Sequence, residues 1–367
     1  MHMNNYKGEN MINLRKVGYT ALAGSLAAVS AQAGEMAVSG SAIATYTTGE
    51  AYNSAQGLGS NTNVSFSGSG ELDNGWGVST FVFVNDAQGG VSSAATTITM
   101  GSMGTIGVAK GGGFNVNGAY DETYPRAYEE NSDAGGQSSL NSVGNWADDN
   151  AIIYKMPAMD LMGATVNIGG EYSLQAGTAT GSDGVAPARS STYGNGTSLG
   201  ITAVYEGLTL GAYGAERENK NPAVADDVMD EFNGSWFVNY NFGPVAIGYQ
   251  ETYFDAGLAH QSTDLTTTSA KSVGYSGGIF TGEAMSIAFN VNDNLSISYS
   301  EVEDTYDAQD NASTAVEDST MKTESVQVAY SMGSMSIKAY STETSNPNYD
   351  TNADNLNVNE IALGLAF

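Results

Sequence analysis

The sequence predicts an all-β protein, a sixteen-stranded antiparallel transmembrane β-barrel. Its last residues alternate bulky apolar side chains at 361, 363, 365 and 367 with small ones at 362, 364 and 366, the pattern of a strand with one apolar face. No run of about 18 apolar residues, the length of a transmembrane helix, follows residue 34. A barrel lacks such runs because only alternate residues of its strands face lipid. Tight turns and long loops also alternate along the chain.

The connections predict the number of strands. Seven tight connections contain Gly, Asn, Asp or Pro, the residues that hairpin turns require, and they lie at 73–75, 102–104, 157–160, 206–207, 241–244, 292–294 and 331–334. Eight longer connections lie near 48–60, 86–91, 112–147, 174–194, 218–231, 256–280, 305–319 and 345–354. Seven turns that alternate with eight loops join sixteen strands. Short turns on one side and long loops on the other are typical of a transmembrane barrel.

Residues 1–33 have the pattern of a cleavable signal peptide. Arg15 and Lys16 precede an apolar, small-residue run at 17–29, and Ala31-Gln32-Ala33 provides a cleavage site. The apolar run is too short to span a bilayer. We therefore expect export, with residues 34–367 forming the barrel domain.

The composition limits the partners and the chemistry. The chain contains 40 acidic and 12 basic residues, a net charge of -28, and no cysteine. The acidity excludes nucleic acid as a partner, because binding to phosphate needs Lys and Arg, and it favours cations. The lack of cysteine excludes disulfides and thiolate metal sites.

Three stretches resemble the general porin family of Gram-negative bacteria. The first is Gly101–Gly111 (GSMGTIGVAKG), which resembles the strand that leads into the family's constriction loop. The second is Asp149–Pro157 (DNAIIYKMP), which is similar to the strand that follows that loop. The third is the last strand, which ends on Phe367 and resembles the family's membrane-assembly signal. Members of this family are sixteen-stranded trimeric diffusion channels.

The resemblance implies that residues 111–148 form a third loop, which folds into the barrel and narrows it. We expect the constriction to be lined by Lys110, Asp121, Glu122, Arg126, Glu129, Glu130, Lys155 and Lys338. Lys155 and Lys338 alternate with apolar residues and so face inward, and Lys110 stands at the position of a family arginine. Family members commonly set an arginine cluster on the early wall, whereas residues 34–109 contain no Lys or Arg. The usual transverse field across the pore is therefore not expected.

The function implied by the resemblance is an outer-membrane porin, a water-filled channel for passive diffusion of small hydrophilic solutes and ions. Its implied partners are the lipid bilayer, lipopolysaccharide and two further copies in a homotrimer. Carboxylates in a narrow passage concentrate cations and repel anions, so we expect cation preference. Two alternatives remain, a surface-displayed binding or adhesion barrel and a substrate-specific porin. The loop carboxylates could also lie in an outer vestibule or bind structural ions.

Acidic clusters in other loops suit Ca²⁺ or Mg²⁺, which could bridge to lipopolysaccharide phosphates. The candidate ligands are Asp226, Asp227, Asp230, Asp304, Asp307 and Asp310. None of these clusters has the spacing of an EF-hand loop, and a solvated acidic surface is the favoured interpretation. We expect no cofactor other than such a structural ion.

An enzymatic function is not expected. His260 is the only histidine after residue 33, and Gly274–Gly278 matches the G-x-S-x-G pattern of a nucleophile elbow. That motif requires the histidine to follow the serine along the chain, whereas here the histidine precedes it. The chain contains no phosphate-binding loop, dinucleotide fingerprint or zinc-ligand spacing.

Overall fold

The strands of the structure, a computed structural model, form one antiparallel sheet that closes on itself. The structure describes residues 35–49, 56–86, 90–132, 138–147, 149–178, 180–181, 192–220, 229–257, 273, 277–309 and 318–367. The first strand pairs with both the second and the last, which closes the barrel. The predicted signal peptide, residues 1–33, lies outside the described residues.

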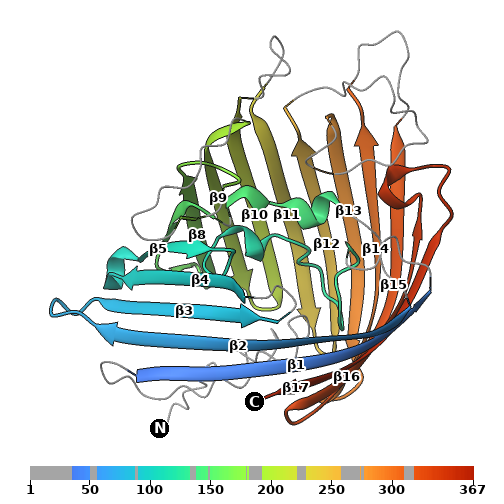
Figure 1. Ribbon diagram of the computed structural model, residues 1–367, viewed down its shortest axis with the longest axis horizontal. Helices are drawn as coiled ribbons and strands as arrows, with labels where there is room; N and C mark the ends of the chain where they lie inside the picture. Colours follow the sequence, from blue (N-terminus) through green and yellow to red (C-terminus); the bar gives the residue numbers. More distant parts are fainter. Residues whose placement is uncertain are drawn as a thin grey trace.

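The elements follow one another with short turns and long connections in alternation (Figure 1). The strands are β1 (Glu35–Gly49), β2 (Gly57–Glu71), β3 (Gly77–Asn85), β4 (Gly90–Thr99), β5 (Thr105–Lys110), β6 (Ala151–Lys155), β7 (Met159–Leu161), β8 (Ala164–Ser173), β9 (Tyr193–Tyr205), β10 (Leu208–Asn219), β11 (Glu231–Phe242), β12 (Val245–Asp255), β13 (Ile279–Asn290), β14 (Leu295–Asp307), β15 (Ser319–Met332), β16 (Met335–Ser345) and β17 (Leu356–Ala366). Short 3-10 helices are η2 (Gly101–Met103), η3 (Asn117–Ala119), η4 (Ser139–Ser142), η5 (Asn145–Ala147) and η6 (Pro347–Tyr349).

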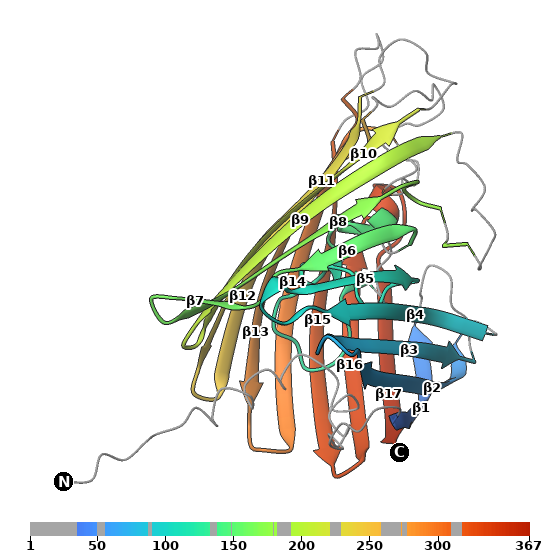
Figure 2. The ribbon, with the colours of Figure 1, turned by 90° about the vertical axis from the view of Figure 1, so that its left-hand side faces the viewer.

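The barrel has the predicted sixteen strands, because β6 and β7 are two parts of one spanning strand. Both pair with β8, Ala151–Lys155 along one part of it and Met159–Leu161 along the other. Between them lies Pro157, which has no N–H to donate to the ladder. Figure 2 shows the strong inclination of β8–β11 relative to β13–β15 as the sheet winds round.

One predicted turn is wrong. The turn expected at 157–160 is the interruption between β6 and β7, and the chain reverses instead at Met162 and Gly163. Both residues have positive φ, 55° and 88°, as a two-residue hairpin turn of the primed type requires. The other six tight connections turn where predicted, and the eight long connections follow β1, β3, β5, β8, β10, β12, β14 and β16.

The wall has one apolar and one polar face. On β13, Met285 and Ile287 are 54% and 47% exposed, whereas Ala284 and Ala288 on the opposite face are buried. Exposed apolar side chains of this kind recur round the barrel, as on β9 and β15, where Leu199 and Val326 occupy the same face. We call these two surfaces the apolar face and the polar face.

The C-terminal strand has the predicted apolar face and also closes the barrel. Ile361 and Leu363 are exposed, whereas Ala362 between them is 1% exposed. β17 pairs with β16 on one side and with β1 on the other. The backbone of Phe367 exchanges hydrogen bonds of 2.8 and 3.0 Å with Gly40. Its role as an assembly signal stays a prediction.

Among the described residues, no helix is long and apolar enough to cross a membrane.

Candidate functional site

The connection between β5 and β6, residues 111–150, is the candidate functional segment. In Figure 1 its coils lie across β10–β13. We call it the β5–β6 segment. From Val116 to Tyr128 its hydrogen bonds with the polar face run from β8 to β17, and from Ser138 to Gly144 they return from β14 to β11.

The segment begins on β8, at a buried carboxylate. Glu171 is 4% exposed and accepts hydrogen bonds from the backbone N–H of Val116 and, at 2.5 Å, from the hydroxyl of Ser198 on β9. The ammonium group of Lys155 on β6 donates to the carbonyl of Asn115 at 3.0 Å and lies 4.5 Å from the centre of the Phe114 ring. Glu171 and Lys155 therefore fix the first turn of the segment.

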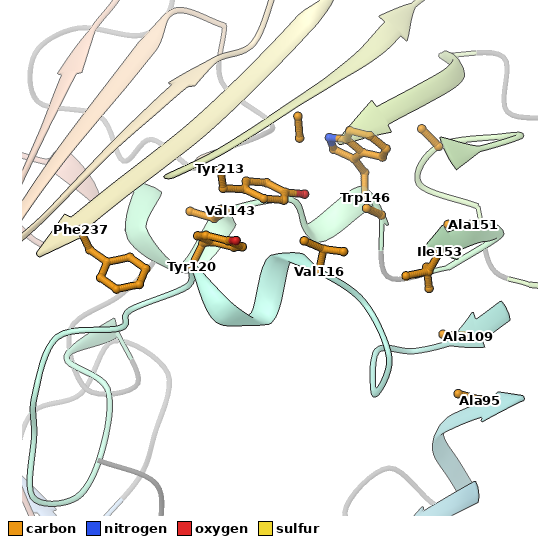
Figure 3. Close-up of a cluster of buried hydrophobic side chains, with 13 residues drawn as sticks. Ala95, Ala109, Val116, Tyr120, Val143, Trp146, Ala151, Ile153, Tyr213 and Phe237 are labelled. Atoms are coloured by element: carbon orange, nitrogen blue, oxygen red, sulfur yellow. The ribbon is translucent and has the colours of Figure 1, made fainter. Parts of the chain in front are cut away.

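Tyr120 fixes the segment to β9–β12. Its carbonyl accepts hydrogen bonds from Gln250 at 2.6 Å and from Ser235 at 3.1 Å. The ring stacks on Tyr213 with the ring centres 5.1 Å apart, and Figure 3 shows the two rings with Val143 beside them. Gln250, which is fully buried, also accepts from the backbone N–H of Thr123 at 2.7 Å.

Tyr128 marks the far end of the segment, on β15–β17. Its N–H donates to Gln327 at 2.8 Å, and its hydroxyl donates to Glu360 at 2.8 Å. The ammonium group of Lys338 lies 4.8 Å from the centre of the Tyr128 ring, and the ring of Tyr340 lies 5.8 Å away. Because Tyr128 is only 5% exposed, both its ring and its hydroxyl are held by the wall.

A second buried carboxylate holds the returning part of the segment. Asp304 on β14 is fully buried and accepts from the Ser138 hydroxyl at 2.8 Å, from the Ser139 N–H at 2.6 Å and from the Ser139 hydroxyl at 2.5 Å. Its other oxygen accepts from the Tyr349 hydroxyl at 2.9 Å. Further along, the N–H of Gly144 donates to Asn233 on β11 at 2.9 Å.

Glycines of the wall make room for the large side chains of the segment. At each of six polar-face glycines, an added Cβ atom would overlap a side chain of the segment. The pairs are Gly107 with Phe114, Gly169 with Val116, Gly196 with Trp146, Gly200 with Tyr120, Gly248 with Pro125 and Gly282 with Leu140. The wall therefore approaches the segment more closely than any residue with a Cβ would allow.

Two of the predicted constriction acids are engaged inside the segment. Glu122 is fully buried and accepts from the hydroxyls of Tyr124 at 2.9 Å and Ser132 at 2.5 Å. Burial raises the pKa of Glu122 above its ordinary value, although Arg126 and the two hydroxyls act in the opposite direction. Arg126 pairs with Glu130 and donates to the carbonyl of Glu122.

The structure brings together some of the other predicted residues. Lys155 and Lys338 lie on the polar face against the segment, and the charge of Glu129 acts on Lys338. Asp121 is partly buried, and its charge acts on Glu122. Lys110 is exposed and shares the face of β5 that carries Ile106 and Val108, so it does not join this group.

The predicted metal ligands do not form a cluster in the part of the chain that the structure describes. No group of three or more His, Cys, Asp or Glu residues among the described residues is arranged to hold a metal ion. Asp304 holds the β5–β6 segment instead, Asp307 accepts from Gln309 at 2.9 and 2.6 Å, and Asp230 accepts from the Asn219 N–H at 3.2 Å. The remaining candidate ligands, Asp226, Asp227 and Asp310, lie outside the described residues. His260 and Ser276 of the nucleophile-elbow pattern also lie outside them.

Sequence reasoning missed Glu171, Glu360 and the two glutamines that bind the segment. A signal for Glu360 existed, because it shares the small-residue face of β17 with Ala362 and Gly364. Gln250 and Gln327 are polar residues at buried positions of otherwise alternating strands. A long polar side chain on a wall of small residues therefore marks a contact with the segment.

The polar face of β1–β4 differs from the rest of the wall. Charged residues occur in these four strands only at Glu35 and Glu71, each at a strand end. The polar-face residues include Ser39, Ser41, Thr45, Thr47, Asn61, Asn63, Ser65, Ser67, Ser79, Asn85 and Thr97. This part of the face is therefore uncharged and consists mainly of hydroxyl and amide groups, with Ile43, Phe81 and Phe83 among them.

The fold is that of known outer-membrane proteins. A structure of Salmonella typhi OmpF in complex with daunomycin is similar at a TM-score of 0.64 and 10% identity over 91% of this chain and 98% of the other. The outer membrane channel DcaP of Acinetobacter baumannii is similar at 0.62 and 12% over 91% and 98%, and a trimer form of Vibrio cholerae OmpT at 0.57 and 13% over 92% and 100%. No family model and no curated protein matches the sequence. At these identities the likeness shows the fold alone, and the chain has the fold of outer-membrane porins.

Proposed function

We propose that this protein is a bacterial outer-membrane porin, a water-filled channel for the passive diffusion of small hydrophilic solutes and ions. The observation that carries the proposal is the closed sixteen-strand barrel with opposite faces of opposite polarity. The apolar face meets the hydrocarbon of the bilayer, and the polar face surrounds water. A barrel of this size has an interior wide enough for an aqueous passage.

In this proposal the β5–β6 segment is a loop inside the lumen, as the resemblance to general porins implied. Its support is the set of contacts with the polar face of β8–β17, from Glu171 through Gln250 to Gln327. The segment then narrows the passage from that side. The open passage is bounded by the segment on one side and by the neutral face of β1–β4 on the other.

The proposed pore prefers cations. The described part of the segment contains Asp121, Glu122, Glu129, Glu130 and Asp149 but only Arg126 as a base, and the facing strands β1–β4 contain no basic residue. Fixed negative charge in a narrow passage raises the local concentration of cations and lowers that of anions. Diffusion through such a pore involves no catalytic step and no cofactor.

The proposed setting is a homotrimer in the outer membrane, in contact with lipid and lipopolysaccharide. The apolar face requires lipid or protein contacts, because it exposes Leu363, Ile287 and Leu199 at more than two fifths of their surface. A Vibrio cholerae protein of the same fold is described as a trimer. Cross-linking of the detergent-solubilised protein tests the number of subunits.

Reconstitution into a planar bilayer tests the function. The purified protein is expected to give discrete conductance steps, and the reversal potential across a KCl gradient is expected to have the sign of potassium flow. A barrel that only displays binding loops gives no steps. A substrate-specific porin gives a current that its solute blocks at saturating concentration. Anion preference contradicts the selectivity part of the proposal and leaves the pore itself intact.

A further inference from the structure

Glu360 lies where the far end of the β5–β6 segment meets the barrel's closing seam. It belongs to β17, on the polar face, with Thr47 of β1 and Tyr340 of β16 as its direct partners in the sheet. One carboxylate oxygen accepts from the Tyr128 hydroxyl at 2.8 Å, and the other accepts from the Thr47 hydroxyl at 2.9 Å. Glu360 therefore stands at the boundary between the loop-covered wall and the neutral face of β1–β4.

Most of the other acids of the polar face and of the segment are either buried or paired with a base; Asp121 and Asp149 are partly buried. Glu171 and Asp304 are at most 4% exposed and are saturated by donors from the segment and the wall. Glu122 is fully buried and Glu130 pairs with Arg126. Neutral donors do not cancel the charges of Glu171 and Asp304, but burial keeps these two carboxylates out of contact with an ion in the passage.

Glu360 differs from these acids in both respects. Its side chain is partly exposed, and among the described residues no ion pair engages it. Both of its donors are neutral hydroxyls, so neither cancels its charge. Glu129 is the acid of the β5–β6 segment at this end, and its charge acts on the ammonium group of Lys338.

We propose that Glu360 is the main residue that sets the cation preference of the pore, by presenting an uncompensated carboxylate to the passage beside the neutral wall. This proposal rests on the proposed function. Lys338 is buried 4.8 Å from the centre of the Tyr128 ring, where its charge offsets that of Glu129.

The test is the reversal potential of Glu360→Gln in a planar bilayer across a KCl gradient. Glutamine keeps one oxygen that accepts from one of the two hydroxyls, and its NH2 group donates to the other hydroxyl, which then acts as an acceptor. The variant therefore removes the charge and retains a hydrogen bond to both Tyr128 and Thr47. The cation-to-anion permeability ratio is expected to fall by about twofold or more at low salt, with single-channel conductance of similar size. The difference in permeability ratio between the variant and the wild type shrinks as the salt concentration is raised, because dissolved ions screen the charge of Glu360.

Glu343→Gln is the matched control. It changes the net charge of the protein by the same amount, but Glu343 is exposed on the opposite face of the adjacent strand β16. Its permeability ratio is expected to equal that of the wild type. Lys338→Met removes the positive charge that offsets Glu129, and its permeability ratio is expected to rise.

The outcomes separate this inference from the pore itself. A wild type that gives no conductance steps contradicts the proposed function. A conducting wild type whose permeability ratio is unchanged in Glu360→Gln contradicts the role of Glu360 alone. An equal fall in Glu343→Gln also contradicts it, because the effect then follows the total charge. Heat-dependent mobility on a gel verifies that each variant is folded.

Discussion

The polar face of β8–β17 differs from the polar face of β1–β4 in its side chains and in its contacts with the β5–β6 segment. β8–β17 contain buried acceptors and glycines that fit the β5–β6 segment, as at Glu171, Gln250 and Asp304. β1–β4 present Ser, Thr and Asn side chains and contribute to the packing of the segment mainly through Phe81 and Ala95. The wall of β8–β17 holds the segment, whereas β1–β4 make few contacts with it and, in the proposed pore, border the passage.

In the proposed pore, acidic residues then have two separate uses. A carboxylate removed from water must accept several hydrogen bonds, and Asp304 does so from two hydroxyls, an N–H and a tyrosine. That saturation makes it a good anchor for a loop, and its burial keeps it out of contact with ions. In the proposed pore, selectivity then depends on the few acids, such as Glu360, that remain partly exposed.

The largest expected effect comes from removing the anchor at the far end of the segment. Tyr128→Ala deletes a ring that is 5% exposed and the hydrogen bond to Glu360. Removing a buried aromatic side chain costs about 3–5 kcal/mol. This cost exceeds the stabilisation from the two hydrogen bonds that remain, which join the Gln327 side chain to the N–H of residue 128 and to the carbonyl of Glu129. We expect the end of the segment to leave the wall, which changes single-channel conductance and increases current noise.

Tyr128→Phe is the control for this variant. It keeps the ring between Lys338 and Tyr340 and loses only the hydroxyl, a cost of about 1 kcal/mol. Its conductance is expected to stay close to that of the wild type. Conductance that is the same in all three proteins contradicts the assignment of the segment to the lumen.

Most of the fold could be predicted from the sequence, because strand alternation and turn chemistry are local. The alternation at Ile361 to Phe367 and the paired turn residues at Glu206-Gly207 act within a few residues of each other. The exception is instructive. Proline interrupts the hydrogen-bond ladder of a strand and is also common in turns, so Pro157 alone does not distinguish an interrupted strand from a turn. Only the pairing of both β6 and β7 with β8 distinguishes them.

The site could be predicted only in outline. The acidic composition of residues 111–148 was visible, but which acids are buried depends on partners far away in the chain, such as Asp304 and Ser139, which are 165 positions apart. Lys110 shows the opposite case. Its alternation with Ile106 and Val108 already pointed to the apolar face, whereas the family resemblance suggested the lumen.

A positive charge on the neutral half is expected to have a smaller effect, on selectivity alone. Asn63 lies on the polar face of β2, between Ser41 and Asn85. In Asn63→Arg, a unit charge about 4 Å from a passing ion is worth about 1 kcal/mol in water, or about fivefold in partitioning. The cation-to-anion permeability ratio is expected to fall, because the added charge lowers the partitioning of cations and raises that of anions, each by up to that factor.

Asn63→Gln provides the comparison in size without charge. Its permeability ratio is expected to match the wild type, and its conductance falls only as far as the longer side chain fills the passage. Should Asn63→Arg leave the reversal potential unchanged, the neutral half of the wall does not border the route of the ions.

The smallest expected effect is a pH dependence of stability from Glu122. Its pKa in the folded protein is raised above the ordinary value of 4.5 because burial outweighs Arg126 and the two hydroxyl donors. Between the pKa of the unfolded chain and that of the folded protein, the folded state therefore keeps a proton that the unfolded chain has lost. Ionisation of Glu122 then lowers the free energy of unfolding. The free energy of unfolding contributed by Glu122 is largest below pH 4.5 and declines as the pH rises towards its folded pKa.

Glu122→Gln isolates that contribution, because every other titrating group is the same in both proteins. Glutamine resembles the protonated acid, so the two proteins are expected to have similar unfolding free energies in acid, measured by urea titration in detergent. As the pH rises, the variant should gain stability relative to the wild type and then level off above the folded pKa. A variant that loses relative stability with rising pH shows instead that the ionised carboxylate, held by Tyr124 and Ser132, stabilises the segment, and that Glu122 belongs with Asp304 as a charged anchor.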